Sequence, residues 1–347
     1  MTPRLKAIDL FSGSGGLTLG LKRAGFKVIG AVDIDSLSVE TYTKNHKSVK
    51  IWQQDIRTLC VNEVKKQLNL KSGELDLLAG CPPCQGFSSI RTLNSSRKRI
   101  TDPRNNLIFE FMRFVKGLRP KVVLLENVPG LAKNWRIKIF SQELKKLGYS
   151  SEYKVLDASN FGVPQRRRRM ILISSRLGAI PFPSEVSGKI VVRDVIGNLN
   201  TAGNSGDALH DLLVDHSAEV LERIKKTPKN GGSRSDLDVE YQLPCHQKCS
   251  GFKDVYGRIK WDDVSPTITS GCINPSKGRF IHPEENRSIT LREAALLQGF
   301  PEDYYFSLKR GKSNAAVLIG NALPPEFVKW HAKEIFHFLR GEVSSAI

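Results

Sequence analysis

The sequence predicts an α/β fold, in which helices cover an open sheet of parallel strands, followed by a second, smaller and irregular domain. Short apolar runs alternate with helix-like stretches over residues 1–176, which is typical of βαβ units. After residue 176, Gly, Pro, Ser and Asn become frequent and periodicity weakens, although aromatic and aliphatic residues continue. The length of 347 residues allows one large domain or two of moderate size.

The individual elements follow from apolar runs and from the glycines that end them. Predicted strands cover residues 6–11, 27–32, 75–79, 122–125 and 169–174, and a further strand precedes Asp55. Predicted helices cover residues 17–24, 36–45, 218–226, 289–298 and 325–339. Open sheets of this kind bind ligands at the carboxyl ends of their strands, so chemistry is expected at those positions.

The charge distribution favours a polyanionic partner. The net charge is +18, and between Arg91 and Arg176 there are 20 basic and 6 acidic residues, a local net charge of +14. Residues 177–260 are close to neutral. A surplus this local predicts a phosphate-binding face, although a solvated surface is the alternative. A membrane is disfavoured because no run approaches ~18 apolar residues. Six cysteines and no signal-peptide pattern indicate reduced, intracellular thiols.

A glycine-rich segment, residues 9–17 (DLFSGSGGL), joins the first predicted strand to the first helix. It differs from the dinucleotide pattern G-x-G-x-x-G because residue 18 is threonine, and it lacks the lysine of a phosphate-binding loop. Asp33 closes the second strand and Asp55 follows the third, where carboxylates would bind ribose hydroxyls. This combination suits an adenosyl ligand without phosphate, and a tight structural turn is the alternative.

A second candidate site follows the strand at 75–79, which ends in Gly-Cys-Pro-Pro and then Cys84. A thiol at a strand end in the most basic part of the chain can serve as a nucleophile. Cys81 and Cys84 form a C-x-x-C spacing that also fits a redox pair or half a zinc site. The two prolines between them weaken the redox interpretation, and no second C-x-x-C completes a metal site. A buried inert cysteine is the remaining alternative.

Five motifs together resemble those of the DNA cytosine-C5 methyltransferases of prokaryotic restriction-modification type, in the order that this family keeps. They are residues 9–17 (DLFSGSGGL), 82–88 (PPCQGFS), 126–128 (ENV), 163–169 (VPQRRRR) and 319–325 (IGNALPP), and residues 292–301 (REAALLQGFP) resemble a sixth. The resemblance implies a Rossmann-like methyltransferase domain for S-adenosylmethionine at 1–176, completed by 311–347. It implies a target-recognition domain at 177–310.

The resemblance also assigns catalytic roles. Cys84 matches the nucleophile that adds to C6 of cytosine, so that C5 can attack the methyl group of S-adenosylmethionine. Glu126 matches the glutamate that contacts N3 and the exocyclic amine, and a capping or salt-bridged acid is its alternative. The family's Gln-x-Arg-x-Arg pattern falls on Gln165, Arg167 and Arg169, with Arg167 near cytosine O2 and Arg169 supporting Glu126 or the loop. The run of four arginines leaves this register open by one position.

The family's cofactor residues correspond to a set that includes Phe11, for which an ordinary core position is the alternative. The full set is Phe11, Gly13, Ser14, Gly15, Gly16, Asp33, Ile34, Asp55, Ile56, Pro83, Leu107, Asn321 and Ala322. The target base must leave the duplex stack, and residues 88–104 resemble the loop that closes over it. Predicted DNA contacts are Ser88, Arg91, Arg97, Lys98, Arg99, Arg234, Arg258 and Arg279.

The expected partner is double-stranded DNA, bound by a monomer in the cytoplasm at the nucleoid, with a cognate restriction endonuclease acting on the same site. No membrane partner is expected. A tRNA cytosine methyltransferase is one alternative, but its branch carries Pro-Phe-Thr after Pro-Pro-Cys-Gln, where this chain has Gly-Phe-Ser. A non-catalytic DNA-binding protein is another, disfavoured because every catalytic position is filled. Cys245, His246 and Cys249 suggest zinc only weakly, so no metal is expected.

Overall fold

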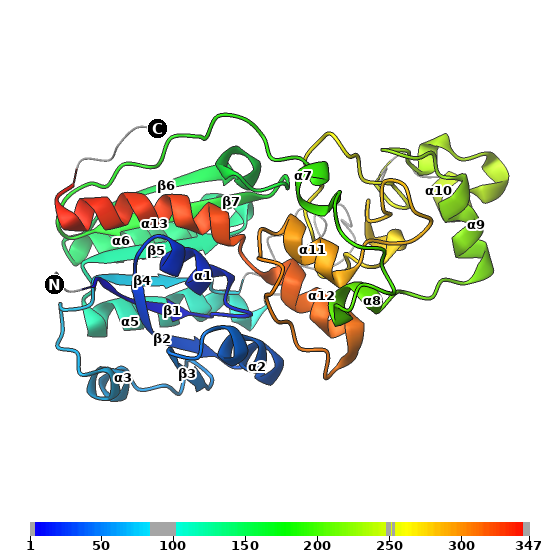
Figure 1. The fold of residues 1–347 in the computed structure, drawn as a ribbon. Helices are drawn as coiled ribbons and strands as arrows, with labels where there is room; N and C mark the ends of the chain where they lie inside the picture. The colour runs from blue at the N-terminus through cyan, green and yellow to red at the C-terminus, as the bar shows by residue number, and fades with distance from the viewer. Residues whose placement is uncertain (1–3, 84–101, 248–250, 252–253, 343–347) are drawn as a thin grey trace. The chain divides into compact units, whose positions relative to one another are not determined.

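The computed structural model describes residues 4–83, 102–247, 251 and 254–342 (Figure 1). It divides into two compact units. The first consists of Met1–Phe161, Arg168–Val186 and Leu323–Ile347, and the second of Gly162–Arg167 and Ser187–Ala322. Residues 177–186 of the predicted recognition region lie in the first unit, and residues 311–322, predicted to complete the catalytic domain, lie in the second. That the second unit recognises the target stays a prediction.

The first unit is built on a seven-stranded sheet with the order β3-β2-β1-β4-β5-β7-β6. The strands are β1 (Lys6–Leu10), β2 (Lys27–Asp33), β3 (Lys50–Gln53), β4 (Leu77–Gly80), β5 (Val122–Asn127), β6 (Ser150–Asp157) and β7 (Arg168–Ser175). Neighbouring strands from β3 to β5 pair in parallel, as predicted. The last pairs differ from the prediction, because β7 runs antiparallel to both β5 and β6. The strand order reverses between β1 and β4, which makes this the switch point of the sheet.

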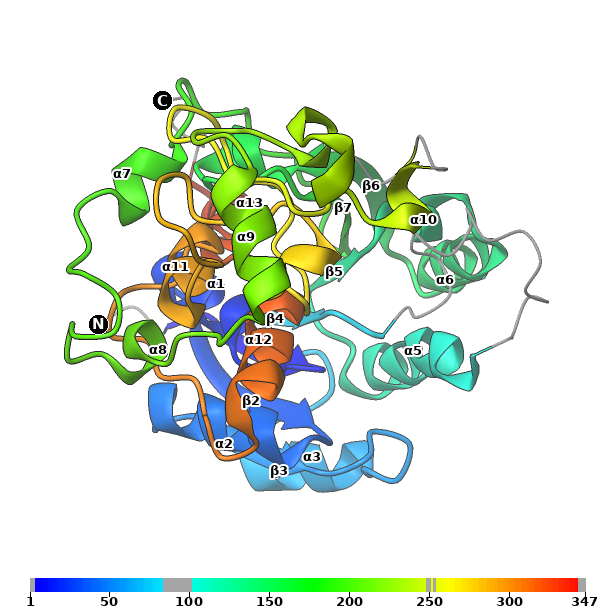
Figure 2. The same cartoon turned by 90° about the vertical axis from the view of Figure 1, so that its right-hand side faces the viewer.

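Helices cover both faces of this sheet. They are α1 (Gly16–Arg23), α2 (Ser36–Asn45), α3 (Val61–Leu68), α5 (Leu107–Leu118), α6 (Trp135–Lys146) and α13 (Pro325–Arg340). The α1 and α13 helices pack together on one face, with α5 and α6 side by side on the other (Figures 1 and 2). Gly20 permits the close approach of α1 and α13, since a Cβ there would lie 2.4 Å from Cβ of Val328. None of the described helices has the length and apolar character that crossing a membrane requires.

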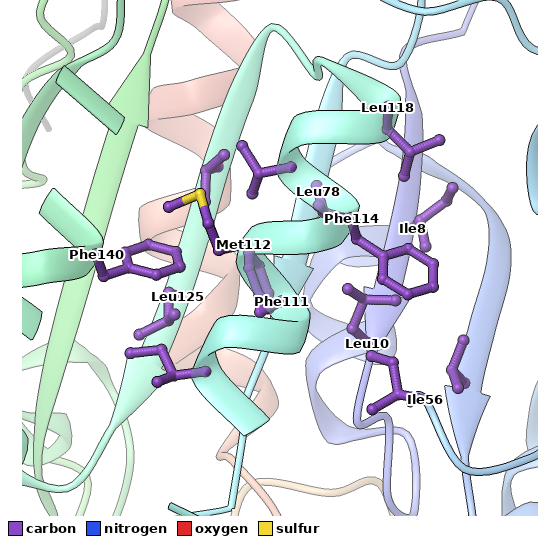
Figure 3. Close-up of a cluster of buried hydrophobic side chains, with 14 of the residues drawn as sticks. Ile8, Leu10, Ile56, Leu78, Phe111, Met112, Phe114, Leu118, Leu125 and Phe140 are labelled. Atoms are coloured by element: carbon purple, nitrogen blue, oxygen red, sulfur yellow. The ribbon is translucent and has the colours of Figure 1, made fainter. Parts of the chain in front are cut away.

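The main core lies between α5 and the sheet (Figure 3). Phe111 and Phe114 of α5 are completely buried against β1 and β4, where Leu10 and Leu78 are equally buried. The α5 sequence LIFEFMRFVKGL places its apolar residues three and four positions apart, which forms one continuous apolar face. Burying each such side chain contributes about 2 kcal/mol. The core therefore fixes the strand ends that carry the candidate site.

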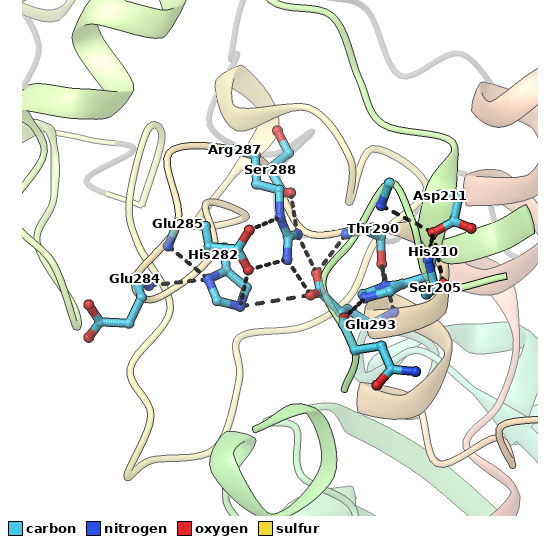
Figure 4. A network of polar contacts seen from close by, with 12 residues as sticks. Ser205, His210, Asp211, His282, Glu284, Glu285, Arg287, Ser288, Thr290 and Glu293 are labelled. Atoms are coloured by element: carbon cyan, nitrogen blue, oxygen red, sulfur yellow. Dashed lines mark hydrogen bonds and ion pairs between the residues drawn. The ribbon is translucent and has the colours of Figure 1, made fainter. Parts of the chain in front are cut away.

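The second unit is largely irregular, and its described residues form only isolated β-bridges. Its helices are α7 (Val192–Ile196), α8 (Ala208–Asp211), α9 (Ala218–Lys226), α10 (Pro244–Gln247), α11 (Leu291–Leu297) and α12 (Gly311–Asn321). Polar contacts supply part of its order. Thr290 and Glu293 form a capping box at the start of α11, and the buried Glu293 carboxylate accepts two bonds from Arg287 at 2.7 and 2.8 Å (Figure 4). Charge-assisted pairs of this geometry fix a helix start firmly.

Candidate active site

The predicted glycine loop follows β1 and leads into α1 through an unusual backbone. Phe11, Gly13 and Gly15 have φ angles of 62°, 51° and 94°, in the left-handed region. This conformation is easy for glycine but rare for phenylalanine, and such strain gathers at functional sites. The Gly13 N–H donates to Oδ2 of Asp33 at 2.8 Å, at the end of the neighbouring strand β2. The structure therefore brings together two features that the sequence separated by twenty positions.

Two acidic side chains lie beneath this loop. Asp9 is fully buried, and its Oδ2 accepts a 2.7 Å hydrogen bond from Thr18. Its Oδ1 has no hydrogen-bond partner among the described residues. Burial, with a smaller contribution from the Asp33 carboxylate, raises the pKa of Asp9 to about 7. Burial also raises the pKa of Asp33, although hydrogen bonds from the backbone N–H groups of Asp35 and Gly13 act in the opposite direction and lower it. Two carboxyl groups and no basic side chain in the loop favour a cationic ligand over a phosphate.

The remaining predicted cofactor residues of the first unit differ in exposure. Ile34 is 64% exposed beside Asp33, which is unusual for a large apolar side chain and fits a ligand contact. Asp55 is held by the exposed Arg57, whose Nε lies 3.0 Å from both carboxylate oxygens, and these bonds lower the pKa of Asp55. Ile56 is instead a buried member of the core, and Leu107 packs against the same core.

For the other members of the predicted cofactor set, the structure shows only how far each residue is buried. Ser14, Gly15 and Gly16 are buried in the loop, and Pro83 is half-buried at the last described position before Cys84. Asn321 is exposed and Ala322 is buried. These two residues belong to the second unit, so their role at the glycine loop stays a prediction.

A second group lies at the ends of β4 and β5. Gly80 pairs with Leu125, so the residues that follow, Cys81 and Glu126, are neighbours at the carboxyl edge. The Glu126 side chain is almost buried, and its Oε1 lies 2.9 Å from Nε of Arg169 on β7. Burial, and next the Glu126 carboxylate, raise the pKa of the Cys81 thiol well above its ordinary value. Cys81 therefore stays protonated beside Glu126, a contact that the sequence pattern did not indicate.

Asn127 fixes the chain that leads toward Cys84. Its Nδ2 donates to the carbonyl of Pro82 at 2.9 Å, and its Oδ1 accepts from the N–H of Val128. Cys84 itself lies outside the described residues, as do Ser88, Arg91, Arg97, Lys98 and Arg99. The bond from Asn127 to Pro82 holds the end of β4 next to the Glu126 carboxyl. The glycine loop lies on the other side of the switch point.

The arginine run alternates between buried and exposed positions, as an extended chain does. Gln165 and Arg167 are buried, Arg169 is half-buried, and Arg166 and Arg168 are exposed. The Arg167 guanidinium donates to the carbonyls of Ile268, Gly320 and Ala322, all within the second unit. The Gln165 amide donates to Gln298 and accepts from the N–H of Ile268. These contacts hold Gln165 and Arg167 within the second unit, and the position of Arg167 near cytosine O2 stays a prediction.

Three arginines predicted to contact DNA make hydrogen bonds inside the second unit, and their contacts with DNA stay a prediction. Arg258 is fully buried, and its guanidinium donates to four carbonyl groups and to the amide oxygen of Asn286. Arg234 is 5% exposed and donates to the carbonyl of Gly251. Arg279 pairs with Asp254 and donates to three carbonyls. Their donors satisfy backbone acceptors that an irregular domain leaves unpaired, so the structure gives these side chains an architectural role.

The structure describes only part of the segment from Cys245 to Cys249, for which the sequence suggested zinc only weakly. Cys245 is exposed, and Cys249 lies outside the described residues. The sequence did not predict a role for four polar residues that lie behind the glycine loop, namely Asp9, Thr18, Tyr42 and His46. Only Asp9 carries a sequence signal, because it opens the DLFSGSGGL motif. The others contact one another only after α1 and α2 pack.

A glycine loop and an acidic strand end at the switch point of this sheet define a protein of the methyltransferase fold. A crystallised E. coli prophage protein described as a DNA modification methyltransferase shares that fold, with a TM-score of 0.74 and 25% identity over 97% of this chain and 99% of that one. The sequence profile of the C-5 cytosine-specific DNA methylases matches residues 5–337, and the chain belongs to this family.

Two relatives show how far the similarity extends. Type II methylase M.HgiDII of Herpetosiphon aurantiacus is 36% identical, and the alignment covers 96% of each protein. Type II methyltransferase M1.HphI of Haemophilus parahaemolyticus is also 36% identical, over 92% of this chain and 84% of that protein. The prediction from the five motifs, a DNA cytosine-C5 methyltransferase, is thereby confirmed at the level of the family.

Proposed function

We propose that this protein transfers a methyl group from S-adenosylmethionine to C5 of a flipped-out cytosine in a specific duplex DNA sequence, with Cys84 as the nucleophile. One observation carries the proposal. The glycine loop after β1 and the segment after β4 flank the switch point, where open α/β sheets bind their ligands. A cofactor held by the first lies beside a base held by the second.

The residues at the loop fit this cofactor. S-adenosylmethionine supplies the methyl group from a sulfonium centre and carries no phosphate. The left-handed glycines bring the backbone close to the ligand, Asp33 can accept from ribose hydroxyls, and the exposed Ile34 offers an apolar surface to adenine. Asp9 adds a buried carboxyl oxygen without a hydrogen-bond partner among the described residues. An acidic loop of this kind favours the positive charge of the cofactor.

The groups after β4 and β5 suit the covalent step. The Cys84 thiolate adds to C6 of cytosine, and negative charge then develops toward N3. Glu126 stands one strand away to hold the proton at N3 and to accept from the exocyclic amine. Arg169 keeps the Glu126 carboxyl in place through its 2.9 Å contact. After methylation, a base takes the C5 proton, the C5–C6 double bond forms again, and the C6–S bond breaks to release Cys84 as the thiolate.

We further propose that the enzyme is the modification partner of a restriction system. Both relatives above carry Type II names, which supports that role and a cognate endonuclease acting on the same site. The second unit, at Gly162–Arg167 and Ser187–Ala322, is the proposed target-recognition domain. A monomer acting on DNA at the nucleoid remains our expectation. The match to a DNA methylase family favours DNA over tRNA as the substrate.

Substrate class is tested by incubating the full chain with labelled S-adenosylmethionine and either duplex DNA or tRNA. We expect label in the DNA only. Bisulfite sequencing of DNA from cells that express the protein then identifies the target, seen as one short sequence protected at one cytosine. Label in tRNA alone would overturn the choice of substrate, and label in neither, from a protein that binds DNA, would favour a non-catalytic role.

A further inference from the structure

A buried polar stripe joins α1 to α2 directly behind the glycine loop. Gly15, Thr18 and Lys22 lie three and four positions apart, so they share one face of α1 and its N-cap. Tyr42 and His46 face them from α2, with their rings 4.7 Å apart. The Tyr42 hydroxyl lies 2.7 Å from that of Thr18, which donates to Asp9 at 2.7 Å. The contact between α1 and α2 is therefore made by polar groups, whereas packed helices ordinarily meet through apolar side chains.

The partners of His46 determine which of its nitrogens carries the proton. Nδ1 lies 3.2 Å from Nζ of Lys22, and Nε2 lies 3.2 Å from the carbonyl oxygen of Gly15. A lysine ammonium can only donate, so Nδ1 must accept. The Gly15 carbonyl can only accept, so Nε2 must carry a proton and donate. Both contacts are satisfied by one species, the neutral imidazole protonated at Nε2.

The surroundings of His46 keep it in this neutral form. The side chain is 3% exposed, and burial, followed by the charge of Lys22, lowers the pKa of His46 to about 4. Burial also lowers the pKa of Lys22. A protonated ring would leave Lys22 facing a second cation. The ring is therefore neutral around pH 7.

The contact with Gly15 controls the direction of the loop backbone. The Gly15 carbonyl already accepts from the N–H of Leu19 at 2.9 Å, and His46 occupies its second lone pair. In a trans peptide the carbonyl of Gly15 and the N–H of Gly16 point in opposite directions. Holding that carbonyl toward α2 therefore directs the Gly16 N–H away from α2, at the start of a helix where donors are available to a ligand.

We propose that His46 is a positioning residue for the cofactor, which holds the Gly15 carbonyl and so presents the backbone donors of the glycine loop to S-adenosylmethionine. This inference rests on the proposed function, because it concerns the same cofactor site. Because His46 is buried, it would act through the Gly15 carbonyl and not by direct contact with the cofactor or the base. Its removal should weaken cofactor binding while leaving the methyl-transfer step intact once the cofactor is bound.

The test compares four full-length proteins by calorimetric titration with S-adenosylmethionine. His46→Leu removes both contacts, and His46→Gln returns an amide donor near the Nε2 position. Tyr42→Phe is the matched control, which removes the hydroxyl that meets Thr18 and leaves His46 in place. Losing one neutral hydrogen bond of this kind corresponds to about a tenfold change in Kd. We expect His46→Leu to bind about tenfold more weakly, His46→Gln to bind within about threefold of the wild type, and Tyr42→Phe to bind as the wild type.

Kinetics separate positioning from a general loss of structure. At saturating cofactor, kcat and the KM for DNA of His46→Leu should match those of the wild type, and only the KM for the cofactor should rise. If His46→Leu does not fold, the pair His46→Gln and His46→Asn decides, because asparagine reaches the Lys22 side and not Gly15. The inference is overturned if His46→Leu and His46→Gln bind S-adenosylmethionine with equal affinity. Where His46→Leu does not fold, equal affinities of His46→Gln and His46→Asn overturn it. A wild type that binds no S-adenosylmethionine would instead overturn the proposed function.

Discussion

Replacing Arg169 by Gln tests whether its ion pair holds Glu126 in place. Nε of Arg169 lies 2.9 Å from Oε1 of Glu126, and the side chains are 15% and 11% exposed. Two unit charges about 4 Å apart interact by about 4 kcal/mol at an effective dielectric constant of 20. Desolvation offsets part of this attraction, but removing one partner leaves the other charge buried. We therefore expect Arg169→Gln to lower the free energy of unfolding by about 3 kcal/mol.

Arg168 provides a matched control on the same strand. It is exposed, and its side chain points to the face of the strand opposite to that of Arg169, so Arg168→Gln should change stability by less than about 0.5 kcal/mol. A double-mutant cycle with Glu126→Gln, measured by urea denaturation of the four proteins, isolates the pair. We expect a coupling energy of about 2 kcal/mol. We also expect kcat of Arg169→Gln to fall by about a hundredfold, because a misplaced Glu126 no longer meets cytosine.

Two results would refute this reasoning. A coupling energy near zero would mean that the ion pair does not determine the environment of Glu126. Equal losses of kcat in the Arg168 and Arg169 variants would mean that both act through DNA phosphates and that the pair has no special role. In the second case the loss of DNA affinity relative to the wild type should grow as ionic strength falls, because salt then screens the missing phosphate contacts less.

Three further predictions concern the second unit, the basic segment and pH. Arg258→Met should destabilise the protein by about 4 kcal/mol, because several buried carbonyls lose their donor, and a stable variant with altered site preference would restore the DNA role of Arg258. Neutralising Arg97, Lys98 and Arg99 should reduce the slope of log K against log salt by about 3 without changing the target, and a changed target would contradict this. Burial lowers the pKa of His331 to about 4 from 6.5, so the unfolded state binds its proton first as pH falls from 6.5. Stability is therefore lost on acidification, and His331→Leu should reduce that loss by about 1.4 kcal/mol per pH unit between pH 6 and 5, whereas an unchanged slope in urea titrations would exclude His331 as its source.

The sequence predicted the elements whose packing follows from local pattern. The glycine loop could be located because left-handed backbone demands glycine, and strands β1, β2 and β5 are apolar runs buried on both faces. The β6 strand was not predicted because its first five residues are exposed and form no apolar run. The antiparallel direction of β7 was equally hidden, since pairing direction depends on partners far along the chain.

Some residues of the candidate site could likewise be located from local sequence pattern, and others could not. Glu126 is the penultimate residue of β5, and the sequence placed it near the carboxyl end of that strand. The sequence left the register of the arginine run open by one position, because alternate burial of Arg167 and Arg169 appears only in the folded chain. The roles of Arg258 and His46 could not be read from sequence, because each depends on backbone carbonyls that converge only in the folded chain.

The covalent intermediate offers the most direct test of the central proposal. Duplex DNA with 5-fluorocytosine at the target position should trap the enzyme after methyl transfer, since fluorine cannot leave as the C5 proton does. In the presence of S-adenosylmethionine we expect an adduct that survives denaturing electrophoresis in the wild type and is absent in Cys84→Ser. An undiminished adduct in Cys84→Ser, or no adduct in a wild type that methylates the same sequence with an ordinary cytosine, would contradict the assignment of Cys84 as the nucleophile.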